Sequence, residues 1–142
     1  MKRSGSAVWK GSAKEGQGTI STPSKALSET RYSFTSRFEG DTVGTNPEEL
    51  IAGAHAGCFN MALSFILGNA GFTPDSLDTT ATVNIENING GWEITTIHLE
   101  LKGRVPGLDE AGFQNYATTA KENCPVSKVL NAKISMNATL EK

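Results

Sequence analysis

The stretch that most constrains the fold is the long apolar segment from Gly44 to Gly71. Asn46 can cap the start of a helix here, because its side chain can accept a hydrogen bond from a free first-turn amide. Pro47 suits the first helical position, and Gly68 and Gly71 are typical of a helix end. We therefore predict one helix of roughly 20 residues, ~30 Å long.

Apolar residues recur along this segment at the spacing of a helix face. One stripe consists of Leu50, Ala54, Cys58, Met61, Ala62 and Phe65. Further apolar residues widen the stripe over most of the circumference, so we expect the helix to be buried on nearly all sides. Polar residues such as His55 and Asn60 interrupt the segment before it reaches the ~18 apolar residues of a membrane span. We therefore expect no membrane anchor.

Length and charge limit the possible classes of protein. The chain has 142 residues, which predicts a single domain over residues 1–142. A net charge of −2 gives no electrostatic basis for binding nucleic acid. Residues 1–11, MKRSGSAVWKG, lack the apolar core of a secretory signal, so we expect a cytoplasmic location. In that reducing compartment, the two cysteines are expected to be free, catalytic or metal-binding rather than a structural disulfide.

The remaining elements are predicted from periodicity and turn residues. Strand patterns occupy residues 6–10, 18–22, 31–38, 77–88, 92–105 and 132–140. Asn89-Gly90-Gly91 indicates a hairpin between the fourth and fifth strands. Residues 109–123 predict a second helix, and residues 125–130 a short third one. The order β-β-β-α-β-β-α-α-β does not alternate regularly, which predicts an α+β fold with a mainly antiparallel sheet.

The two cysteines, Cys58 and Cys124, lie on the apolar stripes of two different predicted helices. Two buried helices in one small core are expected to touch, which can bring the sulfurs together. Cys124 directly precedes Pro125, so it is a candidate N-cap of the short helix, where the helix dipole can stabilise a thiolate. Apolar surroundings raise the pKa of a thiol, so a reactive Cys58 requires a nearby cation. The alternative is that each cysteine packs as a small apolar residue.

Other readings of the same residues stay open. His55 lies one helical turn before Cys58, and with Cys124 it can form a His-Cys-Cys metal site, although a fourth ligand is lacking. A hydrolase that uses Cys58 and His55 is a further alternative, as is packing of His55 in the helix. A non-enzymatic dimeric stress protein or small-molecule-binding protein is another alternative.

Four segments carry a resemblance to a known family: RFEG at 37–40, GTNPEELI at 44–51, AHAGCF at 54–59 and NCPVS at 123–127. Together they strongly resemble the osmotically inducible protein C (OsmC) and organic hydroperoxide resistance (Ohr) family. The match runs almost from end to end of the chain. The RFEG segment and the histidine three positions before Cys58 resemble the OsmC branch in particular.

The resemblance implies an OsmC/Ohr-like fold, with a sheet that wraps the long central helix in an intertwined homodimer. It implies a thiol-dependent peroxidase that needs no cofactor and reduces organic hydroperoxides, and hydrogen peroxide more weakly, in oxidative and osmotic stress defence. Cys58 matches the peroxidatic cysteine and Cys124 the resolving one. Arg37 and Glu48 match the charged pair that prepares the thiolate. Members of the family are recharged by a dithiol reductant, which in the sister branch is of the lipoyl type.

Glu48 and Arg37 also have simpler interpretations, as a helix-capping residue and an exposed strand residue. Glu48 and Cys58 lie on one predicted helix, ten residues and therefore ~15 Å apart. An Arg37 paired with Glu48 cannot easily reach Cys58 of the same chain. If the three residues form one site, Arg37 and Glu48 come from the partner subunit. We therefore expect an obligate homodimer with composite active sites.

Overall fold

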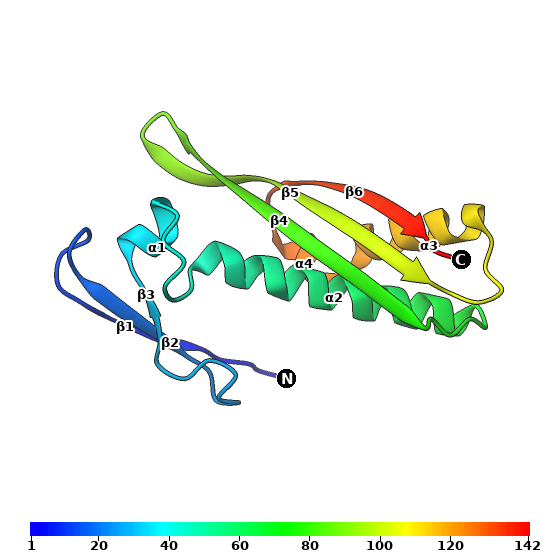
Figure 1. The fold of residues 1–142 in the computed structure, drawn as a ribbon, viewed down its shortest axis with the longest axis horizontal. Helices are drawn as coiled ribbons and strands as arrows, with labels where there is room; N and C mark the ends of the chain where they lie inside the picture. The colour runs from blue at the N-terminus through cyan, green and yellow to red at the C-terminus, as the bar shows by residue number, and fades with distance from the viewer. The chain divides into compact units, whose positions relative to one another are not determined.

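The computed structural model describes residues 1–142, which divide into two compact units, Met1–Leu50 and Ile51–Lys142. Each unit contains a three-stranded sheet. The long helix α2, Pro47–Asn69, begins in the first unit and continues through the second (Figure 1). The expected single domain stays a prediction.

The sheet of the first unit is antiparallel. It consists of β1 (Ser6–Lys10), β2 (Gln17–Ser21) and β3 (Thr30–Tyr32), in the order β1-β2-β3. Gly18 on β2 lies under two aromatic rings, where a Cβ atom would come within 2.4 Å of Tyr32 and 2.6 Å of Trp9. Only glycine therefore lets these rings pack 5.4 Å apart, centroid to centroid, on the sheet.

The predicted strand over residues 31–38 is wrong from Ser33 onwards. The strand ends at Tyr32, and a short helix follows, α1, Phe34–Phe38. Ser33 caps this helix, because its Oγ accepts a hydrogen bond from the Ser36 amide at 3.1 Å while the Ser36 Oγ accepts one from the Ser33 amide at 2.8 Å. These two local bonds outweigh the strand preference of the aromatic residues around them.

The predicted ends of the long helix are confirmed. The Asn46 side chain accepts a hydrogen bond from the Glu49 amide at 2.7 Å, as an N-cap does. At the other end, Gly71 has a φ of 90°, and the Phe72 amide donates to the Leu67 carbonyl at 2.8 Å. This is the arrangement in which a glycine reverses the chain and satisfies the last helical carbonyls.

The expected burial of α2 on nearly all sides is wrong within the second unit. One face, with His55, Phe59, Leu63 and Leu67, is fully buried. On the opposite face Met61 and Phe65 keep 64% and 68% of their surface exposed. The other exposed residues of that face are Gly53, Ala54, Gly57 and Gly68. Three members of the predicted stripe, Ala54, Met61 and Phe65, therefore lie outside the core.

The polar residues of α2 do not make it too interrupted for a membrane span, contrary to the expectation from the sequence. The helix is long enough, and its mean hydropathy of 1.6 over 18 residues high enough, to cross a membrane. His55 and Asn60 do not lower this mean hydropathy below the range of a membrane-spanning helix. One helix of this kind is weak evidence for a membrane protein, because the core helices of soluble proteins have the same composition.

The second unit is built on the sheet β4-β5-β6, formed by β4 (Ser76–Ile88), β5 (Gly91–Arg104) and β6 (Lys133–Leu140). β4 pairs antiparallel with β5, whereas β6 runs parallel to β5. The predicted hairpin turn is confirmed, with positive φ angles of 52° at Asn89 and 87° at Gly90. That pair of angles is the type I′ turn that matches the twist of a hairpin.

A bulge explains an irregularity in the pattern of β5. Ile94 and Ile97 are three positions apart, so a regular strand would place them on opposite faces. Ile94 pairs with Ile85 and Thr96 with Asn84, which leaves Thr95 as an extra residue. The bulge returns the following apolar residues to the core face.

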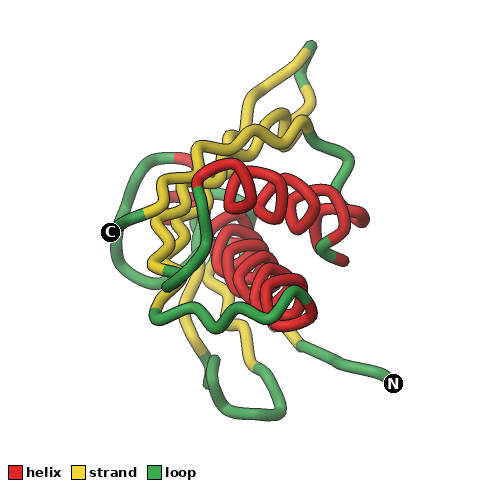
Figure 2. Tube along the Cα trace, turned by 90° about the vertical axis from the view of Figure 1, so that its right-hand side faces the viewer, coloured by secondary structure: helices red, strands yellow, loops and turns green.

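Helices α2 and α3 (Glu110–Asn123) lie on one face of this sheet, and α4 (Pro125–Val129) follows α3 (Figure 2). Asp109 caps α3 through a 2.8 Å hydrogen bond from the Gly112 amide. The core between the helices and the sheet consists of Phe59, Leu63, Leu67, Leu99, Leu101, Val105, Phe113, Ala117, Ala120 and Cys124. The second cysteine is thus a member of the core.

Candidate active site

The structure brings the two cysteines together inside the second unit. Cys58 lies on α2, and Cys124 lies at the junction of α3 and α4. The Cys124 thiol hydrogen-bonds to the Cys58 sulfur, with 2.9 Å between the two Sγ atoms. Both thiols are free, Cys124 fully buried and Cys58 partly exposed. The two sulfurs therefore lie close together, as expected, and Cys58 is the accessible one.

The surroundings of Cys58 oppose its ionisation. Burial raises the pKa of the Cys58 thiol, and the hydrogen bond with Cys124 raises it further. The backbone amide of Val126 hydrogen-bonds to the Cys58 sulfur and lowers the pKa, but its effect is smaller than that of burial. None of these contributions comes from a cation, which is what lowers the pKa of a reactive thiol.

Cys124 occupies the N-cap position of α4, as predicted from the proline that follows it. Its side chain, however, makes no hydrogen bond to the amides of that helix. The thiol is directed to Cys58 instead. The predicted N-cap position of Cys124 is therefore confirmed, while its sulfur adds no hydrogen bond to the cap.

A second pair of side chains, which the sequence analysis did not identify as a pair, joins the same two helices. His55 Nε2 on α2 and Ser127 Oγ on α4 lie 2.7 Å apart in a hydrogen bond. His55 is fully buried, its Nδ1 has no partner, and burial lowers its pKa, so the ring is neutral near pH 7. The signal that was available is spacing, because Ser127 follows Cys124 by the same three positions that separate His55 from Cys58.

The position of His55 bears on two alternatives left open above. No group of three His, Cys, Asp or Glu side chains in residues 1–142 is arranged to hold a metal ion. The His-Cys-Cys set therefore does not form a ligand cluster. His55 directs its Nε2 to Ser127 and has no exposed surface, so it also lacks access to a substrate as a hydrolase base would need.

Arg37 and Glu48 are brought together in the first unit. Arg37 Nε donates to both carboxylate oxygens of Glu48, at 2.9 and 3.3 Å, and its Nη2 lies 2.8 Å from Oε1. The Glu48 side chain is 8% exposed and the Arg37 side chain 39%. Asn46 rather than Glu48 caps α2, and both carboxylate oxygens of Glu48 are paired with the guanidinium.

An apolar hollow of about 300 Å³ adjoins Arg37 in the first unit. Aromatic side chains form most of its wall, and its lining residues are Trp9, Ala13, Tyr32, Ser33, Phe34, Arg37 and Phe38. The Arg37 guanidinium also lies over the Phe38 ring, at 5.0 Å from its centroid. This hollow combines one cation with an apolar wall, as a site for a molecule with one polar end would.

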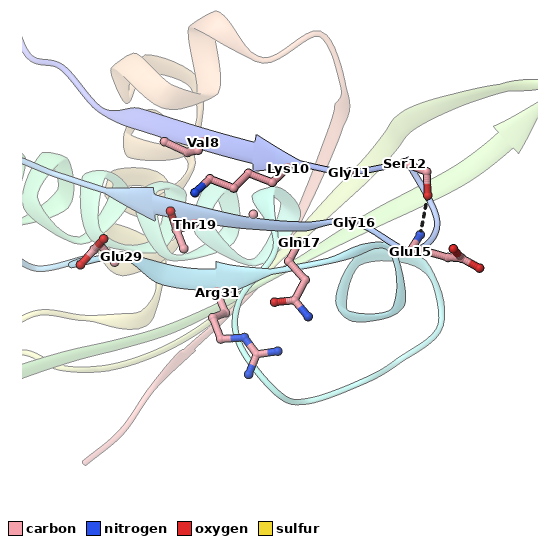
Figure 3. Close-up of a pocket in the computed structure, with 11 residues that line it drawn as sticks. Val8, Lys10, Gly11, Ser12, Glu15, Gly16, Gln17, Thr19, Glu29 and Arg31 are labelled. Carbon is pink, nitrogen blue, oxygen red and sulfur yellow. Dashed lines mark hydrogen bonds between the residues drawn. The ribbon is translucent and has the colours of Figure 1, made fainter.

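A larger hollow, of about 920 Å³, lies along the sheet of the first unit (Figure 3). Its charged residues are of both signs, with Lys10 and Arg31 offset by Glu15 and Glu29. None of Arg37, Glu48, Cys58 or Cys124 lines it. The four predicted site residues and this hollow are therefore separate features.

Comparison with known proteins places this geometry in context. The family described as OsmC-like protein matches residues 39–139. A protein of Escherichia coli named Peroxiredoxin OsmC is 50% identical over 141 residues, covering 99% of this chain and 98% of that protein. A protein of Xanthomonas axonopodis pv. citri named Organic hydroperoxide resistance protein is 34% identical, covering 68% of this chain and 67% of that protein.

Solved structures agree on the fold. An OsmC-like protein from Mycoplasma pneumoniae superposes with a TM-score of 0.76 at 17% identity, covering 100% of this chain and 99% of that one. The organic hydroperoxide resistance protein OhrB of Bacillus subtilis superposes with a TM-score of 0.69 at 23% identity, covering 97% and 98%. The predicted α+β fold of the OsmC/Ohr type is confirmed.

Proposed function

The chain belongs to the OsmC-like protein family, and we propose that it is a thiol-dependent peroxidase that reduces organic hydroperoxides. The observation that carries the proposal is the 2.9 Å contact between the Cys58 and Cys124 sulfurs, one accessible and one buried. The names of the relatives, a peroxiredoxin and an organic hydroperoxide resistance protein, support a peroxidase-type function in stress defence.

The proposed cycle begins at Cys58, the sulfur that a substrate can reach. The Cys58 thiolate attacks the terminal peroxide oxygen, the O–O bond breaks, and the alkoxide leaves as an alcohol after taking a proton. Cys58 is now a sulfenic acid. Cys124 attacks this sulfur, water leaves, and a disulfide forms, which a dithiol reductant, such as one of the lipoyl type, reopens by exchange.

A cation near Cys58 is the missing requirement, and Arg37 is the residue that we propose to supply it. Burial and Cys124 raise the pKa of Cys58, so the single chain leaves the thiol protonated at neutral pH. Arg37, oriented by Glu48, can stabilise the thiolate and donate to the peroxide oxygen. Glu48 and Cys58 are ~15 Å apart along α2, so we assign Arg37 and Glu48 to the site of the partner subunit.

The exposed face of α2 supports the homodimer on which this composite site depends. From Gly53 to Gly68 that face is apolar or glycine over ~22 Å, with Met61 and Phe65 at its centre. An apolar surface of this kind is typical of an interface with another molecule. A second copy of the chain, placed with its own α2 face on this one, covers both.

The apolar hollow beside Arg37 supports organic rather than inorganic hydroperoxides as preferred substrates. Its aromatic wall, which includes Trp9 and Phe34, can pack against an alkyl or aryl group, while the guanidinium binds the polar peroxide end. Hydrogen peroxide has no group to fill the hollow and is expected to react more weakly. The reaction as written needs no cofactor, and we place it in the cytoplasm, where dithiols are available.

The test is the fate of the two sulfurs after treatment with cumene hydroperoxide. We expect one equivalent to convert the reduced protein to the Cys58–Cys124 disulfide, detected by non-reducing mass spectrometry of peptides. Cys58→Ser should abolish peroxide consumption, because no nucleophile remains. Cys124→Ser should consume peroxide and then accumulate oxidised Cys58, because nothing resolves the sulfenic acid.

A non-enzymatic binding protein would behave differently. It would leave both thiols reduced after peroxide treatment, and neither variant would change peroxide consumption. Equal steady-state turnover by the wild-type protein and by both cysteine variants with a dithiol reductant would refute the mechanism.

A further inference from the structure

A buried polar pair, His55 on α2 and Ser127 on α4, spans the two helices that carry the cysteines. Their Nε2 and Oγ atoms lie 2.7 Å apart, and the residues are 0% and 9% exposed. Separating two such groups leaves each without a partner and without water to replace it. The bond therefore resists movement of α4 away from α2.

The polar pair lies next to the sulfur pair. His55 precedes Cys58 by three residues on α2, and Ser127 follows Cys124 by three residues across the start of α4. Residues three positions apart in a helix are neighbours on its surface. The two hydrogen bonds are thus adjacent contacts between the same elements.

Helix α4 has few other means of staying in place. It has five residues, too few for a stable helix without tertiary contacts, and Val129 at its end is 76% exposed. Ser127 is the buried residue of α4, and Val126 packs only partly against the core. Cys124 is held from the α3 side by its amide, which donates to the Ala120 carbonyl at 2.9 Å, and Ser127 is the buried contact that holds it from the α4 side.

We propose that the His55–Ser127 hydrogen bond anchors α4 so that Cys124 stays within reach of Cys58 while the disulfide forms. This inference rests on the proposed peroxidase function. In this step the Cys124 sulfur attacks the Cys58 sulfenic sulfur, the S–S bond forms and the S–O bond breaks. The hydroxide leaves as water with the proton of the Cys124 thiol.

The anchor decides between two fates of the sulfenic acid. With Cys124 in place, the disulfide forms and the enzyme can be recycled. With α4 displaced, a second hydroperoxide can oxidise the sulfenic acid to a sulfinic acid, which a dithiol does not reduce. His55 and Ser127 are positioning residues, because they act through α4 and make no bond to either sulfur.

The experiment measures both fates in the full-length protein. Wild-type protein and Ser127→Ala are treated with increasing cumene hydroperoxide without reductant, and disulfide and sulfinic acid are quantified by mass spectrometry. We expect Ser127→Ala to form the disulfide about tenfold more slowly and to accumulate sulfinic acid at peroxide concentrations that leave the wild type as disulfide. Tenfold corresponds to about 1.4 kcal/mol, within the range for a buried group left without its partner.

Matched variants separate positioning from a general loss of stability. Ser127→Thr keeps the hydroxyl and should restore wild-type disulfide formation. The protein also contains a second histidine–serine bond at 2.7 Å, between His98 Nδ1 and Ser135 Oγ on the exposed side of the sheet. Ser135→Ala removes the same chemical contact elsewhere and should behave as wild type.

The outcomes also separate this inference from the proposed function. A wild-type protein that forms neither sulfenic acid nor disulfide would overturn the peroxidase itself. A wild-type protein that forms the disulfide while Ser127→Ala does so at the same rate would overturn only the anchor. If Ser127→Ala does not fold, two variants of His55 replace it. His55→Gln keeps a donor near the Nε2 position and should retain rapid disulfide formation, whereas His55→Leu should lose it. Equal rates of disulfide formation in the two His55 variants would likewise refute the anchor.

Discussion

At the scale of single residues, the chemistry depends on groups that change the ionisation of one sulfur. The Cys58 thiol is buried enough for its pKa to be raised, and the hydrogen bond with Cys124 acts in the same direction. A thiol in that state is a poor nucleophile near neutral pH. The charged pair of Arg37 and Glu48, preformed at 2.8 Å, is suited to reverse this effect when it is presented to the sulfur.

Replacing Arg37 tests this assignment. We expect Arg37→Gln to lower the peroxidase rate at neutral pH by about a hundredfold, because one charged donor to the reacting atoms is lost. Removing a cation leaves the pKa of Cys58 raised, so the thiolate forms only at higher pH and the pH–rate profile moves upwards. Stopped-flow measurement of peroxide consumption from pH 5 to 10 checks both effects.

The control for this variant is Arg31→Gln, which removes an exposed arginine of the same unit that forms no ion pair with a carboxylate. It should keep the wild-type rate and profile. An unshifted profile in Arg37→Gln would show that Cys58 is activated by another group.

At the scale of elements, the second unit depends on close packing between α3 and the central strand β5. Gly103 on β5 is buried under the ring of Phe113, where a Cβ atom would come within 2.6 Å of the ring. The absence of a side chain lets α3 approach the sheet, and α3 ends at Cys124. Packing at Gly103 therefore contributes to the placement of Cys124.

Gly103→Ala should destabilise the protein by about 1–3 kcal/mol, because the added methyl group overpacks a filled core. Urea denaturation followed by circular dichroism measures the change in the free energy of unfolding. Lys102→Ala introduces the same residue on the exposed side of the same strand and should change stability by no more than about 0.5 kcal/mol. Equal effects of the two substitutions would contradict the packing argument.

At the scale of the whole molecule, α2 has to satisfy two requirements with opposite faces. Its inner face carries Cys58 and His55 against the second unit, while its outer face presents Met61 and Phe65 to solvent in the single chain. An exposed apolar helix face of this length needs a partner. The proposed homodimer meets this need and supplies the cation that Cys58 lacks.

Phe65→Glu should break this association. A charge in the centre of an apolar interface is expected to convert the dimer to a monomer, measured by light scattering coupled to size-exclusion chromatography. Peroxidase activity should fall with the dimer fraction, because each site then loses Arg37 of the partner. Ile88→Glu, at the exposed end of the hairpin, should leave the mass unchanged. A monomeric wild-type protein with full activity would refute the composite site.

Much of the architecture follows from local sequence. Asn46 and Gly71 set the ends of α2, and Asn89-Gly90 sets the hairpin, because each acts through its own backbone angles or a neighbouring amide. Alternation likewise predicted the strands of the second sheet, apart from the bulge at Thr95. The segment after Tyr32 was mispredicted, because two serine side chains override the strand preference of the aromatic residues there.

Only the tertiary structure decided how the candidate site is assembled. The contact between Cys58 and Cys124, the bond between His55 and Ser127 and the exposed face of α2 each depend on residues far apart in the chain or on a surface left uncovered. Periodicity places an apolar residue on a face but does not specify which face finds a partner. The sequence alone therefore identified the family and its reactive residue types, whereas packing determined which sulfur is accessible, which buried polar pair joins α2 and α4, and which face of α2 stays exposed.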